Sequence, residues 1–365
     1  MKAHALVLTE PGHLEARDLP FPEIGEDDGL LRVEATGICG SDVHQFRGTL
    51  VGAPCVTPTI PGHEVVGRVE RAGAAALARW GVSVGDLVVM EEVVMCGECP
   101  RCRGGGPGCD HMRVYGLSVR VDEPPGLWGG YATHVYLHPQ VRLHRVPDGM
   151  TAEEAALFVP IANGIRWGAT VPGTGPGSTV VVMGPGQQGL GCLVGALDAG
   201  ADAVHVTGRS ADARRLDVAR ALGAASVIDV DTVDPVARVN ELTGGRGADI
   251  VIDATAGATV VIPQAIEMVR NGGTIVLGGL KGFAEIPGFV SDRVVLKQLR
   301  IQGVGGHDHA SVEAALALIA SGRFPLERMR THVLPLDQAE AAIELLEGTA
   351  GGLASEAPIH VTLVP

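Results

Sequence analysis

The sequence lacks an excess of basic residues. Only 28 Lys and Arg stand against 42 Asp and Glu in 365 residues, which gives a formal net charge of -14 at pH 7. The basic residues are scattered rather than gathered into a stripe, so little attraction to a phosphate backbone is expected. Nucleic acid is therefore excluded as the expected partner.

The first residues of the sequence also lack the pattern that is typical of a secretory leader, which argues against secretion. Its first residues, MKAHALVLTEPG, alternate like a strand and contain no apolar run followed by a cleavage site. The uncharged stretch at 178–197 has about the length of a membrane span, but Gly-Pro-Gly and Gln-Gln interrupt it, and a buried strand, turn and helix explain it better. We expect a cytoplasmic protein with no membrane-spanning segment.

Aromatic residues make up only 3% of the chain, whereas glycine reaches 52 residues and aliphatic content is high. This balance is typical of compact sheet-and-helix proteins with many tight turns. The length suits two domains. The first 150 residues consist of short strands separated by Gly/Pro turns, for example at 63–73 and 85–92, and predict a mostly β domain.

From about residue 178 the pattern changes to apolar strands that alternate with helices. Strands are expected at 178–183, 203–207, 226–230, 249–254 and 274–279, and helices at 187–199, 211–222, 235–242 and 259–270. Continuous apolar strands between helices predict a parallel sheet covered on both faces, a doubly wound α/β fold. Two more helices at 310–321 and 337–347, a mobile loop at 347–358 and a strand at 358–365 are expected to follow.

A glycine-rich turn lies at the start of this region. In VVVMGPGQQGLG, Gly184, Gly186 and Gly189 have G-x-G-x-x-G spacing directly after an apolar strand and at the head of a helix, with Gln187 and Gln188 between them. Such glycines allow a tight turn and let the backbone approach a pyrophosphate at the helix N-terminus. The motif predicts a dinucleotide site, and a plain Gly-rich turn is the alternative.

The acid that usually accepts hydrogen bonds from the ribose of NAD is missing after the next strand. Gly208 occupies its place and is followed by Arg209 and Ser210. Loss of the carboxylate removes repulsion of a 2′-phosphate, and Arg209 can pair with that phosphate. NADP is therefore the preferred cofactor. Alternatively, Ser210 caps the helix, Arg209 covers the adenine and NAD is accepted.

Four cysteines lie close together in CGECPRCRGGGPGCD. Cys96, Cys99, Cys102 and Cys109 fit a tetrahedral structural zinc site. Disulfides and iron-sulfur ligation are the alternatives, and a cytoplasmic location disfavours the disulfides. A zinc-ribbon module for docking nucleic acid or protein is disfavoured by the acidic charge and the large nucleotide domain.

A second metal-ligand set stands in GICGSDVH and IPGHEVVG. Cys39 and His63 supply a thiolate and an imidazole, which catalytic zinc commonly uses, and Glu64 adds a carboxylate. The alternative is an ordinary buried cysteine and a capping histidine.

The sequence resembles the zinc-dependent medium-chain alcohol and polyol dehydrogenases over essentially its whole length. The resemblance rests on these two motifs, the four-cysteine lobe, GGYATHVYL at 129–137 and the GPGQQGLG turn. The resemblance implies a GroES-like catalytic domain formed by 1–160 and 303–365, with a zinc lobe at about 92–112, and a Rossmann NAD(P)-binding domain at 161–302. The active site would lie in the cleft between them. The resemblance also implies an enzyme that transfers hydride between NAD(P) and a small alcohol, ketone or aldehyde.

The resemblance further assigns roles to single residues. Cys39 and His63 would be catalytic zinc ligands with Glu64 near the metal, and Asp42 would orient the histidine. Ser41 would contact the substrate hydroxyl and begin a proton relay to the ribose and His44. Such an enzyme is expected to be a homodimer or homotetramer, with 286–303 as the candidate interface.

Two departures from the family pattern are visible. Val159 stands where the family's third ligand falls and cannot bind zinc, so the metal would be held by Cys39, His63, Glu64 and water, held weakly, or lost. Asn163 is then expected at the nicotinamide. The gap from Cys102 to Cys109 is one residue shorter than usual, which the flexible loop can absorb.

The alternative that follows from the missing ligand is a reductase of activated double bonds without catalytic zinc. Two cysteines remain outside both clusters. We expect Cys192 to be a small core residue, and Cys55 is a candidate substitute ligand.

Overall fold

The structure, a computed structural model, describes residues 2–50, 56–104, 108–348 and 357–365. The chain divides into two compact units, Met1–Leu157 with Arg330–Pro365 and Phe158–Met329. The second unit includes helix α11 (His309–Ser321) because it packs on helix α5 (Phe158–Ile165) of the same unit. The sequence places the end of the Rossmann domain at residue 302, before that helix. This boundary between independently folding domains stays a prediction.

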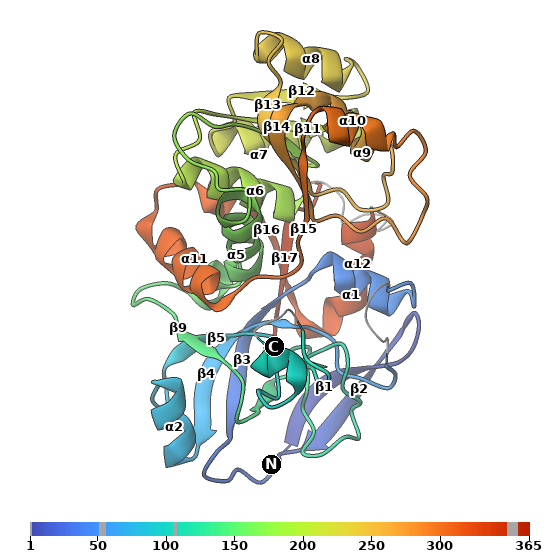
Figure 1. The fold of residues 1–365 in the computed structure, drawn as a ribbon. Helices are drawn as coiled ribbons and strands as arrows, with labels where there is room; N and C mark the ends of the chain where they lie inside the picture. The colour runs from blue at the N-terminus through green and yellow to red at the C-terminus, as the bar shows by residue number, and fades with distance from the viewer. Residues whose placement is uncertain (1, 51–55, 105–107, 349–356) are drawn as a thin grey trace. The chain divides into compact units, whose positions relative to one another are not determined.

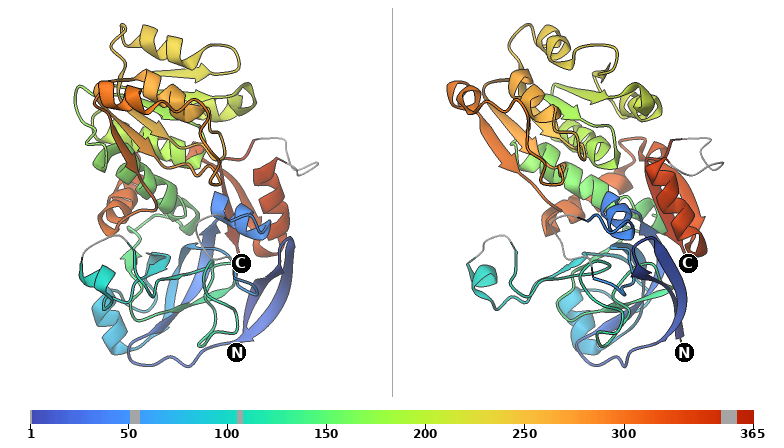
Figure 2. Two further views of the ribbon diagram at one scale, coloured as in Figure 1. Left: turned by 45° about the vertical axis from the view of Figure 1, so that its right-hand side comes forward. Right: turned by 90° about the vertical axis from the view of Figure 1, so that its right-hand side faces the viewer.

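The first unit is built on a seven-stranded, mainly antiparallel sheet, visible in two orientations in Figure 2. Its order is β16-β17-β3-β4-β5-β9, and β8 also pairs with β3. The strands are β3 (Gly29–Gly37), β4 (Glu64–Ala72), β5 (Leu87–Met90), β8 (His134–Leu137), β9 (Leu143–Arg145), β16 (Arg330–Pro335) and β17 (His360–Val364). The C-terminal strand β17 thus lies next to β3, near the start of the chain.

In the described part of this unit, two small sheets and five α-helices accompany the large sheet. The strand pairs are β1 (Lys2–Glu10) with β2 (His13–Pro20), and β6 (Val93–Val94) with β7 (Arg113–Val114). The helices are α1 (Gly40–Phe46), α2 (Ala74–Trp80), α3 (Pro100–Arg103), α4 (Ala152–Ala155) and α12 (Ala339–Glu347). A mostly β unit is therefore confirmed, although α1 and α2 were not expected from the sequence.

The second unit contains a six-stranded parallel sheet in the order β12-β11-β10-β13-β14-β15, with helices on both of its faces (Figure 1). The strands are β10 (Thr179–Met183), β11 (Ala203–Gly208), β12 (Ser226–Asp229), β13 (Ala248–Asp253), β14 (Val269–Leu277) and β15 (Arg300–Gly303). Strands β10 and β13 are almost wholly buried, which their apolar sequences predict. The chain reverses direction across the sheet between β10 and β13, the point where such folds bind nucleotides.

The helices of this unit are α5 (Phe158–Ile165), α6 (Gln187–Asp198), α7 (Ala213–Ala221), α8 (Pro235–Leu242), α9 (Val261–Met268), α10 (Ser291–Leu296) and α11 (His309–Ser321). The doubly wound fold is confirmed. The expectation of a helix over 259–270 was wrong at its end, because Val269 is already extended and begins β14.

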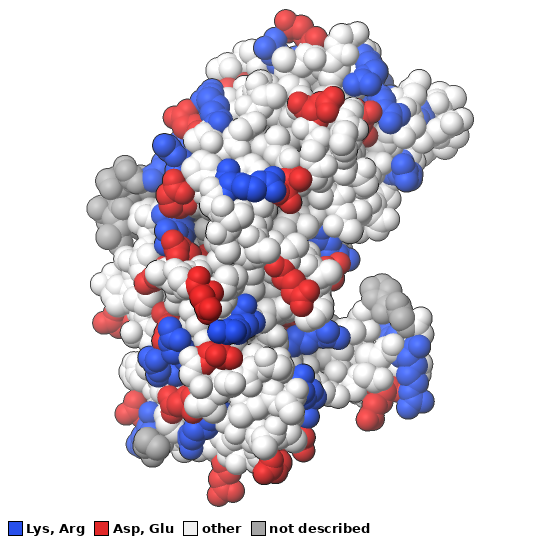
Figure 3. Space-filling model, turned by 90° about the vertical axis from the view of Figure 1, so that its left-hand side faces the viewer, with Lys and Arg blue, Asp and Glu red and all other residues white. Residues whose placement is uncertain are grey.

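None of the described helices is long and apolar enough to cross a membrane. On the face shown in Figure 3, acidic and basic side chains alternate without a large field of one sign. This distribution agrees with the scattered basic residues of the sequence.

Candidate functional site

The glycine turn joins β10 to α6 at the switch point of the parallel sheet. Gly184 has φ +98°, a conformation that favours glycine, and a Cβ on Gly189 would overlap the carbonyl oxygen of Gly184. Gly186 is the N-cap of α6, and a Cβ there would meet nothing within 4 Å. The turn therefore leaves open space directly before the helix N-terminus, which fits the pyrophosphate of a dinucleotide.

Asn163 and Gln188 meet beside this turn. The Asn163 amide donates a hydrogen bond to Oε1 of Gln188 over 3.0 Å. Their helices α5 and α6 can approach closely because a Cβ on Gly164 would overlap the backbone of Gly191. Asn163 and Gln188 lie 25 residues apart in the sequence, and both are expected to contact the cofactor. The structure brings their side chains together.

The end of β11 carries the three residues expected at the adenosine ribose. A Cβ on Gly208 would lie 2.8 Å from Cγ of Pro185 and 3.0 Å from Cδ2 of Leu216, so a larger residue would disturb the turn. Arg209 is exposed, and its guanidinium has no ion pair among the described residues. Ser210 donates its hydroxyl to Asp229, an acid that sequence reasoning missed because it lies on the neighbouring strand β12.

A buried ion pair lies at the end of β13. Lys281 Nζ is 2.8 Å from Oδ2 of Asp253, whose side chain is fully buried. The same ammonium donates to the carbonyl and the hydroxyl of Thr255. Because a Cβ on Gly184 would lie 2.8 Å from Cγ2 of Thr255, this cluster backs the glycine turn. Nothing in the sequence motif marks Lys281.

The first unit brings together Cys39, His63 and Glu64. Cys39 precedes α1, and His63 and Glu64 stand at the start of β4. One ligand atom from each residue lies within 4.8 Å of the others. His63 is 6% exposed and Glu64 is fully buried, so water competes poorly for these groups. One thiolate, one imidazole and one carboxylate form a donor set that suits zinc.

Asp42 orients His63. Its Oδ1 lies 3.1 Å from Nδ1 of His63, and its Oδ2 accepts the Cys39 N–H over 2.8 Å. Burial opposes the imidazolium, but the charge and hydrogen bond of Asp42, with a contribution from Cys39, raise the pKa of His63 well above its ordinary value. Because Nδ1 faces Asp42, Nε2 is the ring nitrogen available to a metal ion, an arrangement common where a carboxylate holds a zinc-binding histidine.

The Glu64 carboxylate has a neighbour that the sequence did not reveal. Nε2 of His360, on β17, lies 3.8 Å from Oε2 of Glu64, and both side chains are fully buried. Neither carboxylate oxygen accepts a hydrogen bond from a described residue. Gly37 makes the room, since a Cβ there would overlap Oε2 of Glu64 and lie 3.1 Å from Nε2 of His360. A fully buried carboxylate that accepts no hydrogen bond is suited to binding a metal ion.

The two residues of the expected proton relay contact other side chains in the structure. Ser41 Oγ lies 3.3 Å from Nε2 of His63. Nδ1 of His44 lies 3.1 Å from Oγ1 of Thr49. Ser41 therefore stands at the ligand face of His63, and His44 at the far end of the short helix α1, which spans 7 residues.

The four cysteines of the lobe converge in space. Sγ of Cys96 lies 3.4 Å from that of Cys109 and 4.0 Å from that of Cys102, and Cys99 and Cys109 are 3.9 Å apart. A tetrahedron with Zn–S bonds of about 2.3 Å has sulfur separations of about 3.8 Å. None of the six described cysteines forms a disulfide. The geometry fits a structural zinc site.

Backbone groups favour thiolates in this lobe. N–H groups of Asp110 and Cys102 lower the pKa of Cys99 to about 6. Burial and the neighbouring thiols raise the pKa of Cys102 to about 12. Four sulfurs this close cannot all ionise unless a cation compensates their charge, so the lobe is suited to metal.

Two other sequence expectations can be placed in the structure, and two fall on residues that it does not describe. Cys192 is fully buried, and burial raises the pKa of its thiol to about 12, so the core role is confirmed. Val159 is 5% exposed within α5 and offers no ligand atom. Cys55 and residues 349–356 of the expected loop lie outside the described residues.

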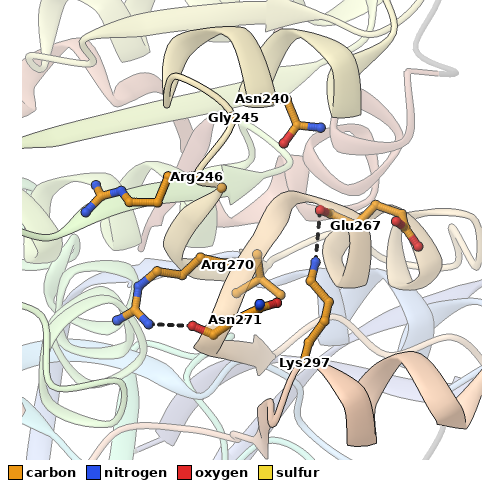
Figure 4. Close-up of a pocket in the computed structure, with 9 residues that line it drawn as sticks. Asn240, Gly245, Arg246, Glu267, Arg270, Asn271 and Lys297 are labelled. Carbon is orange, nitrogen blue, oxygen red and sulfur yellow. Dashed lines mark hydrogen bonds between the residues drawn. The ribbon is translucent and has the colours of Figure 1, made fainter.

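A hollow of about 360 Å³ lies at the amino end of the parallel strands (Figure 4). Its cations are already engaged: Arg270 pairs with Asp249, and Lys297 donates to the carbonyls of Ile266 and Glu267. Cofactors of this fold bind at the opposite, carboxyl edge of the sheet. The hollow is therefore not the dinucleotide site.

Comparison with known proteins agrees with both units. Residues 25–148 match the family "Alcohol dehydrogenase GroES-like domain", and residues 189–321 match "Zinc-binding dehydrogenase". The protein named "Probable alcohol dehydrogenase" of Mycobacterium tuberculosis is 43% identical over 99% of this chain and 98% of its own length.

Solved structures give the same result. An alcohol dehydrogenase from Thermotoga maritima has 29% identity and a TM-score of 0.88, with all of both chains covered. A zinc-binding dehydrogenase from Sinorhizobium meliloti 1021, bound to NADP, has 27% identity and a TM-score of 0.85, again over all of both chains.

The chain belongs to the zinc-type medium-chain dehydrogenase/reductase family. It is a zinc-type alcohol or polyol dehydrogenase that uses a nicotinamide cofactor.

Proposed function

We propose that this dehydrogenase holds its catalytic zinc with Cys39, His63 and Glu64, although Val159 stands where the family's third ligand falls. The observation that supports this most is the Glu64 carboxylate, which is fully buried within 4.8 Å of the other two ligand atoms and accepts no hydrogen bond from a described residue. A buried carboxylate without hydrogen bonds is costly unless a cation compensates it.

Cys39, His63 and Glu64 would hold the metal, which would supply Lewis-acid chemistry for hydride transfer between the substrate alcohol and the nicotinamide. Asp42 keeps His63 in the orientation that leaves Nε2 for coordination. We assign to Ser41 the contact with the substrate hydroxyl, because its own hydroxyl lies 3.3 Å from that nitrogen. The proton then passes by way of the ribose to His44, which passes it on to solvent.

Replacement of the thiolate ligand tests this assignment. Cys39→Ala should abolish alcohol oxidation, reduce zinc content by one ion per chain and leave binding of NADPH unchanged. Cys192→Ala is the matched control, because Cys192 is a buried core residue of α6, and it should keep activity and zinc. Full activity of Cys39→Ala would refute the ligand role. Activity on enones but not on alcohols in the wild type would favour the zinc-free reductase.

We further infer that NADP is preferred and NAD accepted. Gly208 offers no carboxylate against a 2′-phosphate, and the exposed Arg209 guanidinium has no ion pair with a described residue. Arg209→Gln should weaken NADPH binding about tenfold and NADH binding less than twofold, measured by nicotinamide fluorescence. Equal losses for both dinucleotides would refute the role of Arg209.

A homodimer formed through the edge of the parallel sheet is also proposed. Strand β15 pairs only with β14 among the described strands, and its four residues are exposed. The preceding segment exposes apolar side chains, including Leu296 at 80% and Val295 at 71%. Leu296→Asp should lower the sedimenting mass to that of the 37.6 kDa chain, and a monomeric wild type would exclude the interface.

A cytoplasmic location is proposed as well, since both metal sites need reduced cysteines and no described cysteine is in a disulfide. Recovery of the native protein in the membrane or secreted fraction would contradict it.

A further inference from the structure

Ser210 is held by two carboxylates at the end of strand β12. Its hydroxyl donates to Oδ2 of Asp229 over 2.6 Å, and its backbone N–H donates to Oδ2 of Asp231 over 2.9 Å. The Asp231 N–H in turn donates to Oδ1 of Asp229 over 3.0 Å, so the two acids form one connected group. Both donors that Ser210 offers are therefore occupied by negative charge.

The register of the sheet places this group at the edge where the adenosine ribose is expected. Gly208 of β11 is the direct partner of Asp229 in the parallel pair β11 and β12. The Val230 N–H donates to the Gly208 carbonyl over 2.9 Å, which fixes the two strand ends together. Strand β11 does not end in the acid that usually binds the ribose, because Gly208 stands there. The neighbouring strand β12 instead presents Asp229 beside the same turn.

We propose that Asp229 and Asp231 set the balance between the two dinucleotides by opposing the 2′-phosphate of NADP, and this inference rests on the proposed dehydrogenase function. A phosphate monoester carries up to about two negative charges at neutral pH and needs hydrogen-bond donors. To use Ser210 as a donor, the phosphate must displace the carboxylates and approach their charges. The 2′-hydroxyl of NAD is neutral and can donate to a carboxylate, so it meets no such repulsion.

One positive and two negative side chains therefore act in opposition at this site. Arg209, exposed and without an ion pair to a described residue, attracts the phosphate, and the two acids oppose it. The NADP preference is then smaller than Gly208 and Arg209 alone would produce. Neutralising the acids while keeping one acceptor oxygen for each Ser210 donor should release this opposition. The Asp231 N–H then loses its acceptor at position 229, because an amide has only one acceptor oxygen.

The double variant Asp229→Asn/Asp231→Asn makes that change, because asparagine keeps an acceptor oxygen for the Ser210 donors. Kd values for NADPH and NADH are measured by nicotinamide fluorescence at fixed ionic strength, without substrate. NADPH should bind at least about fivefold more tightly than to the wild type, and NADH within about twofold of it.

Asp234→Asn is the matched control. It removes one charge from the same loop. The Asp234 side chain accepts hydrogen bonds from the N–H groups of Val236 and Ala237 at the start of α8, whereas Ser210 donates to Asp229 and Asp231. It should change neither Kd by more than about twofold. An unchanged NADPH/NADH ratio in the double variant, or an equal change in the control, would overturn the inference. A wild type that binds neither dinucleotide would overturn the dehydrogenase function, and this inference with it.

Discussion

Two glycines of the same turn should respond differently to alanine. At Gly186 an added Cβ meets no protein atom within 4 Å, and the residue is an N-cap with φ −70°, which alanine adopts freely. The stability cost of Gly186→Ala should therefore stay under about 1 kcal/mol, the size of an ordinary cap change. The new methyl group occupies the space that we assign to the pyrophosphate, so NADPH affinity should fall at least about tenfold, or about 1.4 kcal/mol.

Gly189→Ala should show the opposite behaviour. The new Cβ would overlap the backbone oxygen of Gly184, and backbone cannot move aside as a flexible side chain does. Overpacking of this kind costs about 1 to 3 kcal/mol or more. For a unit of this size that lowers the thermal midpoint by roughly 2 to 12 °C. Loss of cofactor binding would then accompany loss of stability.

The assay combines the thermal midpoint of each variant without cofactor with its Kd for NADPH. A wild-type midpoint with weakened binding is expected for Gly186→Ala, and a lowered midpoint for Gly189→Ala. If Gly186→Ala binds NADPH as tightly as the wild type, the dinucleotide does not lie before the N-terminus of α6. The assignment of the turn would then be refuted.

Two further predictions concern the buried ion pair and the zinc lobe. Lys281→Met leaves the fully buried Asp253 without its cation and should lower the unfolding free energy by about 3 to 5 kcal/mol, whereas Lys281→Met/Asp253→Asn should recover part of it in a urea titration. A double variant as unstable as the single one would contradict this account. Cys99→Ser should release one zinc per chain and expose the lobe to proteolysis, while NADPH still binds with unchanged Kd. Retention of the full zinc content would contradict the four-thiolate site.

Much of the parallel unit could be predicted because its local signals agree with one another. Strand β10 is a run of apolar residues followed at once by the glycine turn, and this order defines both the element and its function. The helices α1 and α2 of the first unit could not be predicted in the same way, since each spans only 7 residues and shows less than two turns of periodicity.

The proposed ligands of the catalytic zinc were also visible in the sequence, since Cys39 and the pair His63 and Glu64 stand in compact motifs. Their partners were not. His360 reaches Glu64 only because the C-terminal strand β17 pairs with β3, and Asp229 reaches Ser210 only because β12 pairs with β11. Such pairings join residues far apart in the chain, and no local pattern encodes them.

The central claim is that Cys39, His63 and Glu64 bind a second zinc without help from the position of Val159. The most direct test is the zinc content per chain of freshly purified wild type, Cys39→Ala and Glu64→Ala. Two zinc ions are expected in the wild type, one in Cys39→Ala, and fewer than two in Glu64→Ala. A single zinc in a wild-type protein that still oxidises alcohols would contradict the claim.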